Sequence, residues 1–191
     1  MKPILQIIVT TTRPARKGPI LAKWLYQYAK EQGNFEVELI DIADFNLPMF
    51  DEPNHPRLQD YVHTHTKKWS SVIDRADAFI FVIPEYDHLP PSSFINAITY
   101  LNTEWNYKAA AFMSYGGVSG GLRAVETARQ LVNAVRMVPI LDTIPVPHYG
   151  QYIDENEVFV ANELIKKSAD AVLSELLKID NGLSVIRQKA E

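Results

Sequence analysis

The chain has 191 residues, of which 47% are hydrophobic and 22% are charged, and both fractions are ordinary for a globular protein. Its formal net charge of −4 offers no general attraction to nucleic acid or to an anionic membrane surface, so any anion that it binds must be held by local groups. The chain contains no cysteine, which excludes disulfides, thiolate metal sites and a cysteine nucleophile. Redox chemistry would therefore need a borrowed cofactor.

Short apolar runs alternate with longer amphipathic stretches along the chain. In chain order, this pattern predicts a strand at 4–9, a helix at 19–32, a strand at 35–40, a loop at 44–56, a polar helical stretch at 58–76, a strand at 78–83, a helix at 94–101, a strand at 109–113, a helix at 122–136, a strand at 137–141 and a helix at 155–178. Such alternation predicts one α/β domain over residues 1–191, with a parallel sheet covered by helices on both faces. The most apolar run, 78–83, is expected at the centre, whereas the strict alternation at 35–40 suits an edge.

The start of the chain and its apolar runs predict a cytoplasmic protein. The N-terminal sequence MKPILQIIVTTTR reaches a strand-like run at once, and that run is too short for the apolar region of a signal peptide. No apolar stretch approaches the roughly 20 residues that a membrane-spanning helix needs. We therefore expect no membrane partner.

In an open α/β sheet, a ligand lies beyond the carboxyl ends of the strands. The loop after the first strand, TTTRPARKGP at 10–19, combines three hydroxyls and three cations with the free N–H groups of a helix start. These groups suit a phosphate, although a threonine-capped turn with solvated cations would have the same composition. The loop matches neither the Walker pattern nor the dinucleotide pattern G-x-G-x-x-G.

The loop after the third strand is PEYDHLPP at 84–91. Its prolines stiffen the backbone, so a flat ring could lie against it and bond to backbone amides; the alternative is a rigid connector with a packing tyrosine. We expect His88 on the surface rather than acting as an acid or base. Glu85 and Asp87 are expected to be solvated or bonded to the backbone rather than to form an acid–base pair.

The loop after the fourth strand, SYGGVSGGLR at 114–123, holds half of the chain's eight glycines. Glycine lets the backbone approach a ligand closely, and four glycines within six positions exceed what a simple strand–helix turn needs. The composition therefore favours a ligand at this loop.

Taken together, these loops resemble those of the NADPH-dependent FMN reductase family, which includes flavodoxin-like quinone, azo-dye and chromate reductases. The most specific part is PEYDHLPPSSFINAI, followed by EW and then by SYGGVSGGLRA, and the likeness runs from the first strand to the end of the fourth helix. The resemblance implies a flavodoxin-like three-layer α/β/α sandwich whose five-stranded parallel sheet has the order 2-1-3-4-5.

The resemblance also implies an FMN site built from all three loops. The residues assigned to it are Thr11, Thr12, Arg13, Arg16, Gly18 and Pro19 around the phosphate, Pro84, Glu85, Tyr86 and Asp87 flanking the isoalloxazine ring, and Ser114, Tyr115, Gly116 and Gly117 at the other edge of the flavin. No metal and no dedicated acid or base on the protein is implied.

The chain departs from the family pattern at several positions. Thr10 and Thr11 stand where a glycine and a serine are usual, and β-branching restricts the backbone at Thr10. Asp87 replaces an asparagine, and a carboxylate near the pyrimidine edge would disfavour an anionic reduced flavin. Ile95 and Thr99 replace a lysine and an aspartate that often form an ion pair, so we expect an altered subunit contact.

The implied function is electron transfer from NADPH or NADH through FMN to a small acceptor such as a quinone, an azo compound, free flavin or a metal oxyanion. Family members are usually dimers or tetramers, so we expect a homodimer or homotetramer; Trp105 and Tyr107 would lie in its interface or would simply cover the sheet. The alternatives are an FMN-binding electron carrier or redox sensor, and a binding module that has lost FMN. Phosphoryl transfer and ester hydrolysis lack a convincing nucleophile–base pair, and His63 and His65 are two apart, which does not align them on one helical face for a metal.

Overall fold

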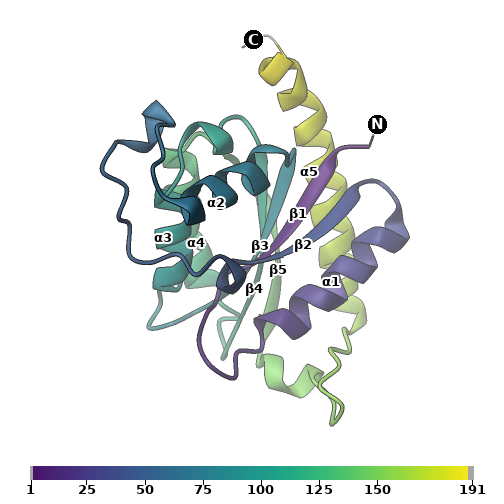
Figure 1. Cartoon of the computed structure of the whole chain (residues 1–191). Coiled ribbons are helices and arrows are strands. Elements are labelled where there is room, and N and C mark those ends of the chain that lie inside the picture. The colour runs from purple at the N-terminus through teal and green to yellow at the C-terminus, as the bar shows by residue number, and fades with distance from the viewer. Residues whose placement is uncertain (1, 189–191) are drawn as a thin grey trace.

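The computed structural model describes residues 2–188 and contains one five-stranded sheet between two layers of helices (Figure 1). The strands are β1 (Ile4–Val9), β2 (Glu36–Asp41), β3 (Ala78–Pro84), β4 (Ala109–Gly116) and β5 (Val138–Pro147). All neighbouring strands pair in parallel, in the order β2-β1-β3-β4-β5. The flavodoxin-like order expected from the sequence is confirmed, with 78–83 at the centre and 35–40 at an edge.

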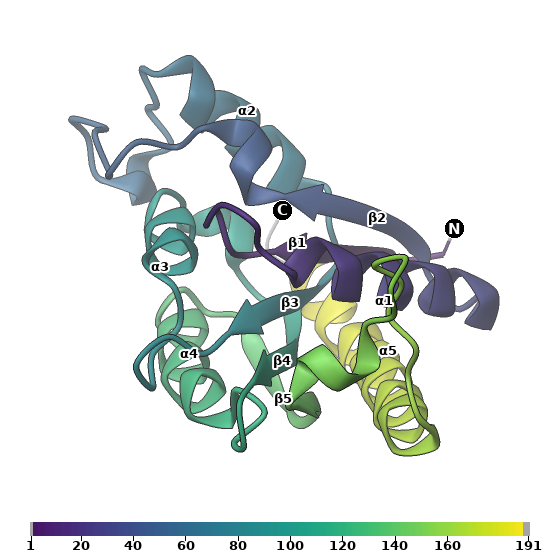
Figure 2. The same ribbon diagram turned by 90° about the horizontal axis from the view of Figure 1, so that it is seen from below.

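Helices cover both faces of the sheet (Figure 2). They are α1 (Gly18–Gln32), α2 (Thr64–Asp74), α3 (Ser92–Thr99), α4 (Leu122–Ala134) and α5 (Glu163–Gln188). The first and last helices pack on one face, and the other three pack on the opposite face. Among residues 2–188, no helix is long and apolar enough to cross a membrane.

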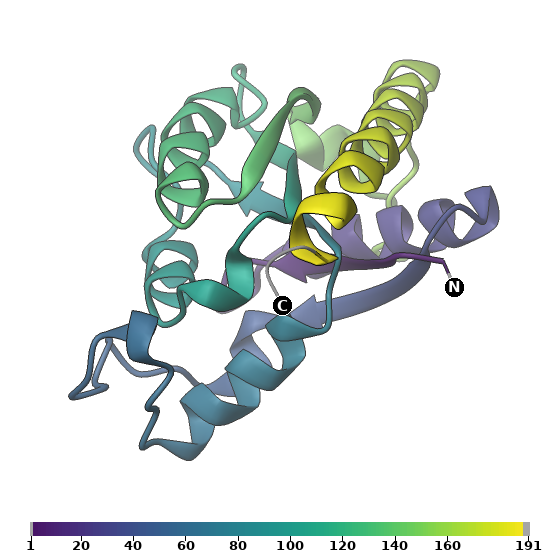
Figure 3. The same cartoon turned by 90° about the horizontal axis from the view of Figure 1, so that it is seen from above.

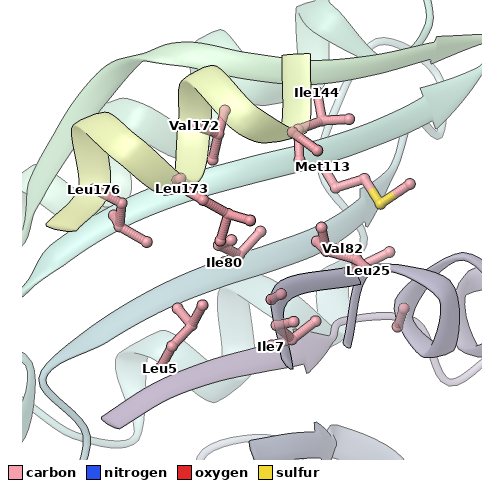
Figure 4. Packing of buried hydrophobic residues seen from close by; sticks show 14 of the residues in the cluster. Leu5, Ile7, Leu25, Ile80, Val82, Met113, Ile144, Val172, Leu173 and Leu176 are labelled. Carbon is pink, nitrogen blue, oxygen red and sulfur yellow. The ribbon is translucent and has the colours of Figure 1, made fainter. Parts of the chain in front are cut away.

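The two faces of the sheet bury different side chains. On the face of α1 and α5, aliphatic residues such as Ile80 from β3, Leu25 from α1 and Leu173 from α5 pack together (Figure 4). On the other face the core is aromatic. Trp105 is completely buried there, in edge contact with Phe79 at 5.1 Å between ring centroids, so it covers the sheet.

The last strand is longer than the pattern predicts. We expected it to end at 141, but β5 continues to Pro147. Its prolines are tolerated because β5 is an edge strand, where one row of N–H groups needs no partner. The pairing with β4 shifts register between Ala110 and Phe112, so Leu141 projects outward and is 88% exposed. β4 also extends past its predicted end, through Gly116.

The last helix begins later and ends later than predicted. Residues 153–159 form a turn in which the carboxylate of Asp154 accepts hydrogen bonds from the backbone N–H groups of Asn156 (2.9 Å) and Val158 (2.8 Å). Asn162 then caps α5 by accepting from the N–H of Ile165 at 2.9 Å, so the helix starts at Glu163 rather than at 155. The turn therefore explains the wrong start.

Candidate functional site

A pocket of about 350 Å³ lies at the carboxyl end of the sheet, which Figure 2 views from below. Four segments line it: the loops after β1 and β3, the end of β4, and the turn after β5. The lining residues are Arg13, Pro14, Ala15, Arg16, Lys17, Pro84, Glu85, Tyr86, Tyr115, Gly116, Gly117 and Tyr149. The structure thus brings residues of all three predicted loops around one hollow.

Six of the residues assigned from the sequence are not part of this lining. Thr12 lines a neighbouring hollow of about 520 Å³ beside α3, and Pro19 lines another of about 460 Å³ between α1 and the turn at 156–159. These six are Thr11, Thr12, Gly18, Pro19, Asp87 and Ser114. A direct contact between any of them and a cofactor remains a prediction.

The threonines after β1 tie their loop to β3 and to the loop that follows β3. The buried hydroxyl of Thr10 donates to the carbonyl of Val82 at 2.9 Å. The hydroxyl of Thr11 lies 2.9 Å from that of Tyr86, within hydrogen-bond distance. Thr10 and Thr11 therefore use their hydroxyls to fix the loop rather than to face the pocket.

The three cations of the first loop have different surroundings. Arg16 donates to the carbonyl of Thr11 at 2.8 Å and forms an ion pair of 2.6 Å with Asp41 at the end of β2. Lys17 pairs with Glu157 at 2.5 Å. Within residues 2–188, Arg13 forms no side-chain hydrogen bond or ion pair with another residue, so Arg13 is the cation left to meet an anion in the pocket.

Helix α1 starts at the floor of the pocket against Tyr115. A Cβ atom on Gly18 would lie 2.9 Å from the hydroxyl oxygen of Tyr115 and 3.0 Å from Cγ2 of Thr11, so only glycine fits without movement. No side chain caps α1, and its first turn contains no acidic residue. Few free N–H groups remain in this first turn, since Pro19 has none and the N–H of Ile20 donates to the carbonyl of Lys17 at 3.0 Å, but the partial positive charge of the helix start suits an anion. Burial raises the pKa of Tyr115, which keeps its hydroxyl neutral.

The loop after β3 folds back as a tight hairpin. The backbones of Tyr86 and Leu89 exchange two hydrogen bonds of 2.9 Å, with Asp87 and His88 between them at φ of 50° and 70°. Consecutive positive φ values are typical of a type I′ turn, in which aspartate and asparagine are tolerated. Asp87 and His88 are exposed, so the surface position expected for His88 is confirmed.

The carboxylate of Glu85 binds the start of α4. Its carboxylate accepts from the hydroxyl of Ser119 at 2.9 Å and from the backbone N–H of Arg123 at 3.2 Å, and it pairs with the guanidinium of Arg123 at 2.5 Å. Burial alone would raise the pKa of Glu85, but these donors outweigh burial and lower the pKa below its usual value. The two carboxylates are thus no acid–base pair, as the sequence led us to expect.

The glycines of the third loop serve different purposes. Gly120 and Gly121 have φ of 61° and 84° and make the turn into α4. A Cβ atom on Gly116 would lie 3.2 Å from the backbone N of Gly121, which makes this approach tight. A Cβ atom on Gly117 would meet nothing within 4 Å, and Gly117 lines the pocket. Its bare backbone is therefore open to a ligand.

Ser114 and Tyr149 differ most from the sequence-based picture. Ser114 is fully buried, and a Cβ on Gly121 would lie 3.0 Å from its own, so it supports the turn from below. Tyr149 enters the pocket from the turn after β5 and meets Tyr115 edge-on, with ring centroids 5.2 Å apart. Sequence reasoning missed Tyr149 because β5 was expected to end at 141; the prolines at 145 and 147 were the available signal.

His63 and His65 do not share a helical face, yet their rings lie together. His63 is extended and precedes α2, so its ring stacks on that of His65 with centroids 5.1 Å apart. Nε2 of His65 lies 3.0 Å from the carboxylate of Asp51. Within the described part of the chain, no group of three or more histidine, cysteine, aspartate or glutamate residues could hold a metal ion.

Comparisons with known proteins agree on one family. The family described as NADPH-dependent FMN reductase matches residues 4–151. The NAD(P)H-dependent FMN reductase C4B3.06c of Schizosaccharomyces pombe is 35% identical over 152 residues, which cover 76% of this chain and 74% of that protein. The NAD(P)H-dependent FMN reductase ntnL of a Nectria species is 33% identical over 150 residues, which cover 74% of each chain.

A solved structure supports the fold independently. The flavoenzyme FerB of Paracoccus denitrificans, an NAD(P)H:(acceptor) oxidoreductase, superposes with a TM-score of 0.74. The superposition covers 94% of this chain and 98% of that chain at 18% sequence identity. At that identity the likeness shows the fold alone, and the fold is the flavodoxin-like sandwich expected from the sequence.

Proposed function

The chain belongs to the NADPH-dependent FMN reductase family, and from this premise we propose that its pocket at the carboxyl end of the sheet holds FMN. The protein is an FMN-dependent oxidoreductase that takes electrons from NADPH or NADH and passes them to a small acceptor. One observation carries the assignment of the site: residues from all three loops named by the sequence line a single pocket.

The residues of this pocket fit the chemistry of FMN. The uncapped start of α1 and the unengaged guanidinium of Arg13 would hold the phosphate. The rigid backbone of 84–86 and the bare backbone of Gly117 would flank the ring. Arg16 supports this arrangement indirectly, because its guanidinium fixes the carbonyl of Thr11 and is neutralised by Asp41.

Bound FMN would supply the redox chemistry between the nicotinamide and the acceptor, and the chain would bind and orient it. The proposed reaction requires no proton transfer from a side chain of the pocket lining. Glu85 is held as a carboxylate by Ser119 and Arg123, and the phenol of Tyr115 is kept neutral by burial. The acceptors that we propose are a quinone, an azo compound, free flavin or a metal oxyanion.

Assembly is a further part of this proposal, with a homodimer or homotetramer as the functional unit. Its support is a group of exposed apolar side chains on α3, α4 and the loops beside them: Met49, Leu89, Ile95, Val118 and Leu122. Replacing both Ile95 and Leu122 by aspartate should yield a monomer in light scattering after size exclusion. A single species of unchanged mass would contradict this interface. We also propose that residues 1–191 act as one domain in the cytoplasm.

The first test of the function is the visible absorption spectrum of the protein mixed with FMN and then with NADPH under argon. We expect bound-flavin bands that bleach when NADPH is added. Bound FMN that NADPH leaves oxidised would favour the electron carrier instead, and no FMN binding would favour a binding module.

A matched pair of variants places the flavin. Gly117→Leu should fold normally, because the added side chain meets open space, yet it should abolish FMN binding by filling the pocket. The control is Gly182→Leu on α5, where a Cβ also meets nothing within 4 Å. Equal FMN affinity of the two variants would show that the flavin does not bind in this pocket.

A further inference from the structure

Helix α4 begins without a capping side chain of its own. Its N-cap is Gly121, and its first turn contains no acidic residue. A helix start usually gains a serine, threonine, aspartate or asparagine, because its first N–H groups lack partners. Such a residue cannot replace Gly121, since φ there is 84° and a Cβ would lie 2.8 Å from the backbone N of Tyr115. The cap must therefore come from another segment.

Glu85 lies where that cap is needed. Its carboxylate accepts from the backbone N–H of Arg123, the second residue of α4, at 3.2 Å. The same carboxylate accepts from the hydroxyl of Ser119 at 2.9 Å and pairs with the Arg123 guanidinium. The hydroxyl of Ser119 in turn accepts from the N–H of Gly121 at 3.3 Å. The side chain of Glu85 is 7% exposed, so water competes little for these bonds.

The same residue joins two walls of the pocket. The backbone N–H of Glu85 donates to the carbonyl of Tyr115 at 3.2 Å, which continues the pairing of β3 with β4 by one residue. Its carboxylate holds the far end of the glycine loop, by which we mean residues 116–121. Glu85, Gly116 and Gly117 all line the pocket, so the bonds of Glu85 hold two adjacent segments of its lining together.

We propose that Glu85 is a positioning residue that caps α4 from a neighbouring loop and thereby holds the glycine loop at the spacing that FMN requires. This inference rests on the FMN site proposed above. It also assigns different roles to the starts of α4 and α1. The start of α4 is already matched by the charge of Glu85, whereas the start of α1 has no acidic residue and stays available for the phosphate.

Three variants test the cap, and a fourth serves as control. Glu85→Ala removes every side-chain acceptor, Glu85→Gln keeps an oxygen for the N–H of Arg123 but loses the charge, and Arg123→Met removes only the guanidinium. The control is Arg75→Met, which breaks an ion pair of 2.9 Å with Glu38 away from the pocket. Each variant is followed by hydrogen exchange of the amides of 116–123 without cofactor, by the dissociation constant for FMN, and by the visible circular dichroism of bound flavin.

We expect a graded response. Glu85→Ala should raise the dissociation constant for FMN by about tenfold or more, since charge-assisted bonds are lost. Glu85→Gln should restore part of the affinity, and Arg123→Met should cost about threefold, because Ser119 and the backbone of residue 123 still bind Glu85. The variant that weakens FMN binding most should also show the fastest exchange at 116–123. The visible dichroism of the bound flavin should change in the site variants. Arg75→Met should match the wild type in all three measurements.

The outcomes separate this inference from the proposed function. If the wild type binds FMN and all three site variants match Arg75→Met in affinity and exchange, the positioning role is overturned while the function stands. If the wild type binds no FMN, the function fails, and the exchange rates without cofactor still decide whether Glu85 caps α4. If Glu85→Ala does not fold, Glu85→Gln and Arg123→Met decide by the same two measurements.

Discussion

The two ends of the sheet use their charged side chains differently. At the amino end (Figure 3), Arg187 of α5 binds Asp77, Asp180 and the carbonyl of Tyr107 at 2.9–3.0 Å. Lys108 donates there to two carbonyls at the end of α2, at 2.7 and 3.0 Å. At the carboxyl end, as far as residues 2–188 show, the guanidinium of Arg13, a bare glycine backbone and a helix start without a side-chain cap remain open. The same architecture thus closes one end for stability and leaves the other able to bind.

The largest effect that would break this comparison is expected at the turn into α4. Gly121→Ala should lower the free energy of unfolding by about 3 kcal/mol and weaken FMN binding, because its φ is 84° and its Cβ would strike the backbone of Tyr115. Gly182→Ala is the control in α5, where the Cβ meets nothing within 4 Å and alanine favours the helix. Urea unfolding of both variants measures the difference; equal unfolding midpoints would contradict the strain assigned to Gly121.

At the amino end, Arg187→Ala should cost about 2 kcal/mol of unfolding free energy and leave FMN binding unchanged. The side chain of Asp180 is 3% exposed and would lose its ion pair with Arg187, and removing one partner of a buried pair is costly. Urea unfolding and an FMN titration on the same preparation test both halves. A changed dissociation constant for FMN in Arg187→Ala would show that the two ends are not independent.

A pH series sharpens the contrast without a substitution in the binding pocket. Burial lowers the pKa of Lys108 to about 8 from 10.5, so the unfolded chain binds more protons between these values and the free energy of unfolding should rise with pH there. Burial raises the pKa values of Tyr61 and Tyr115, so stability should fall once pH exceeds the ordinary tyrosine value of 10. Unfolding midpoints should therefore peak near pH 10, and Lys108→Met should flatten the rising limb. An identical limb in that variant would assign the rise to another group.

The smallest effect is expected at the tip of the loop after β3. Asp87→Asn should change the dissociation constant for FMN by less than about threefold, because Asp87 is exposed and outside the pocket lining, and both residues tolerate its φ of 50°. Two measurements test this prediction: a titration with FMN and the midpoint potential of the bound flavin. A large shift in potential would support the electrostatic influence that the sequence suggested for this carboxylate.

The local sequence pattern predicted the architecture well, because the spacing of apolar residues within each segment indicates whether it forms a strand or a helix. The parallel sheet and the convergence of the three loops follow from alternation and from the geometry of such sheets, whereas the order of the strands came from the resemblance to the FMN reductase family. The ion-pair partners of the charged groups could not be predicted, because they are distant in sequence: Arg16 pairs with Asp41, and Glu85 pairs with Arg123. Tyr149 was missed for a local reason, because the strand was expected to end at 141 and β5 continues to Pro147.

Hydrogen exchange with and without FMN tests the central claim most directly. The account predicts that FMN slows exchange of backbone amides in 10–18, 84–89 and 116–121, at the carboxyl end. Amides at 74–77 and 106–108, at the amino end, should exchange at unchanged rates. Protection confined to the amino end, or spread equally over both ends, would contradict an FMN site in this pocket.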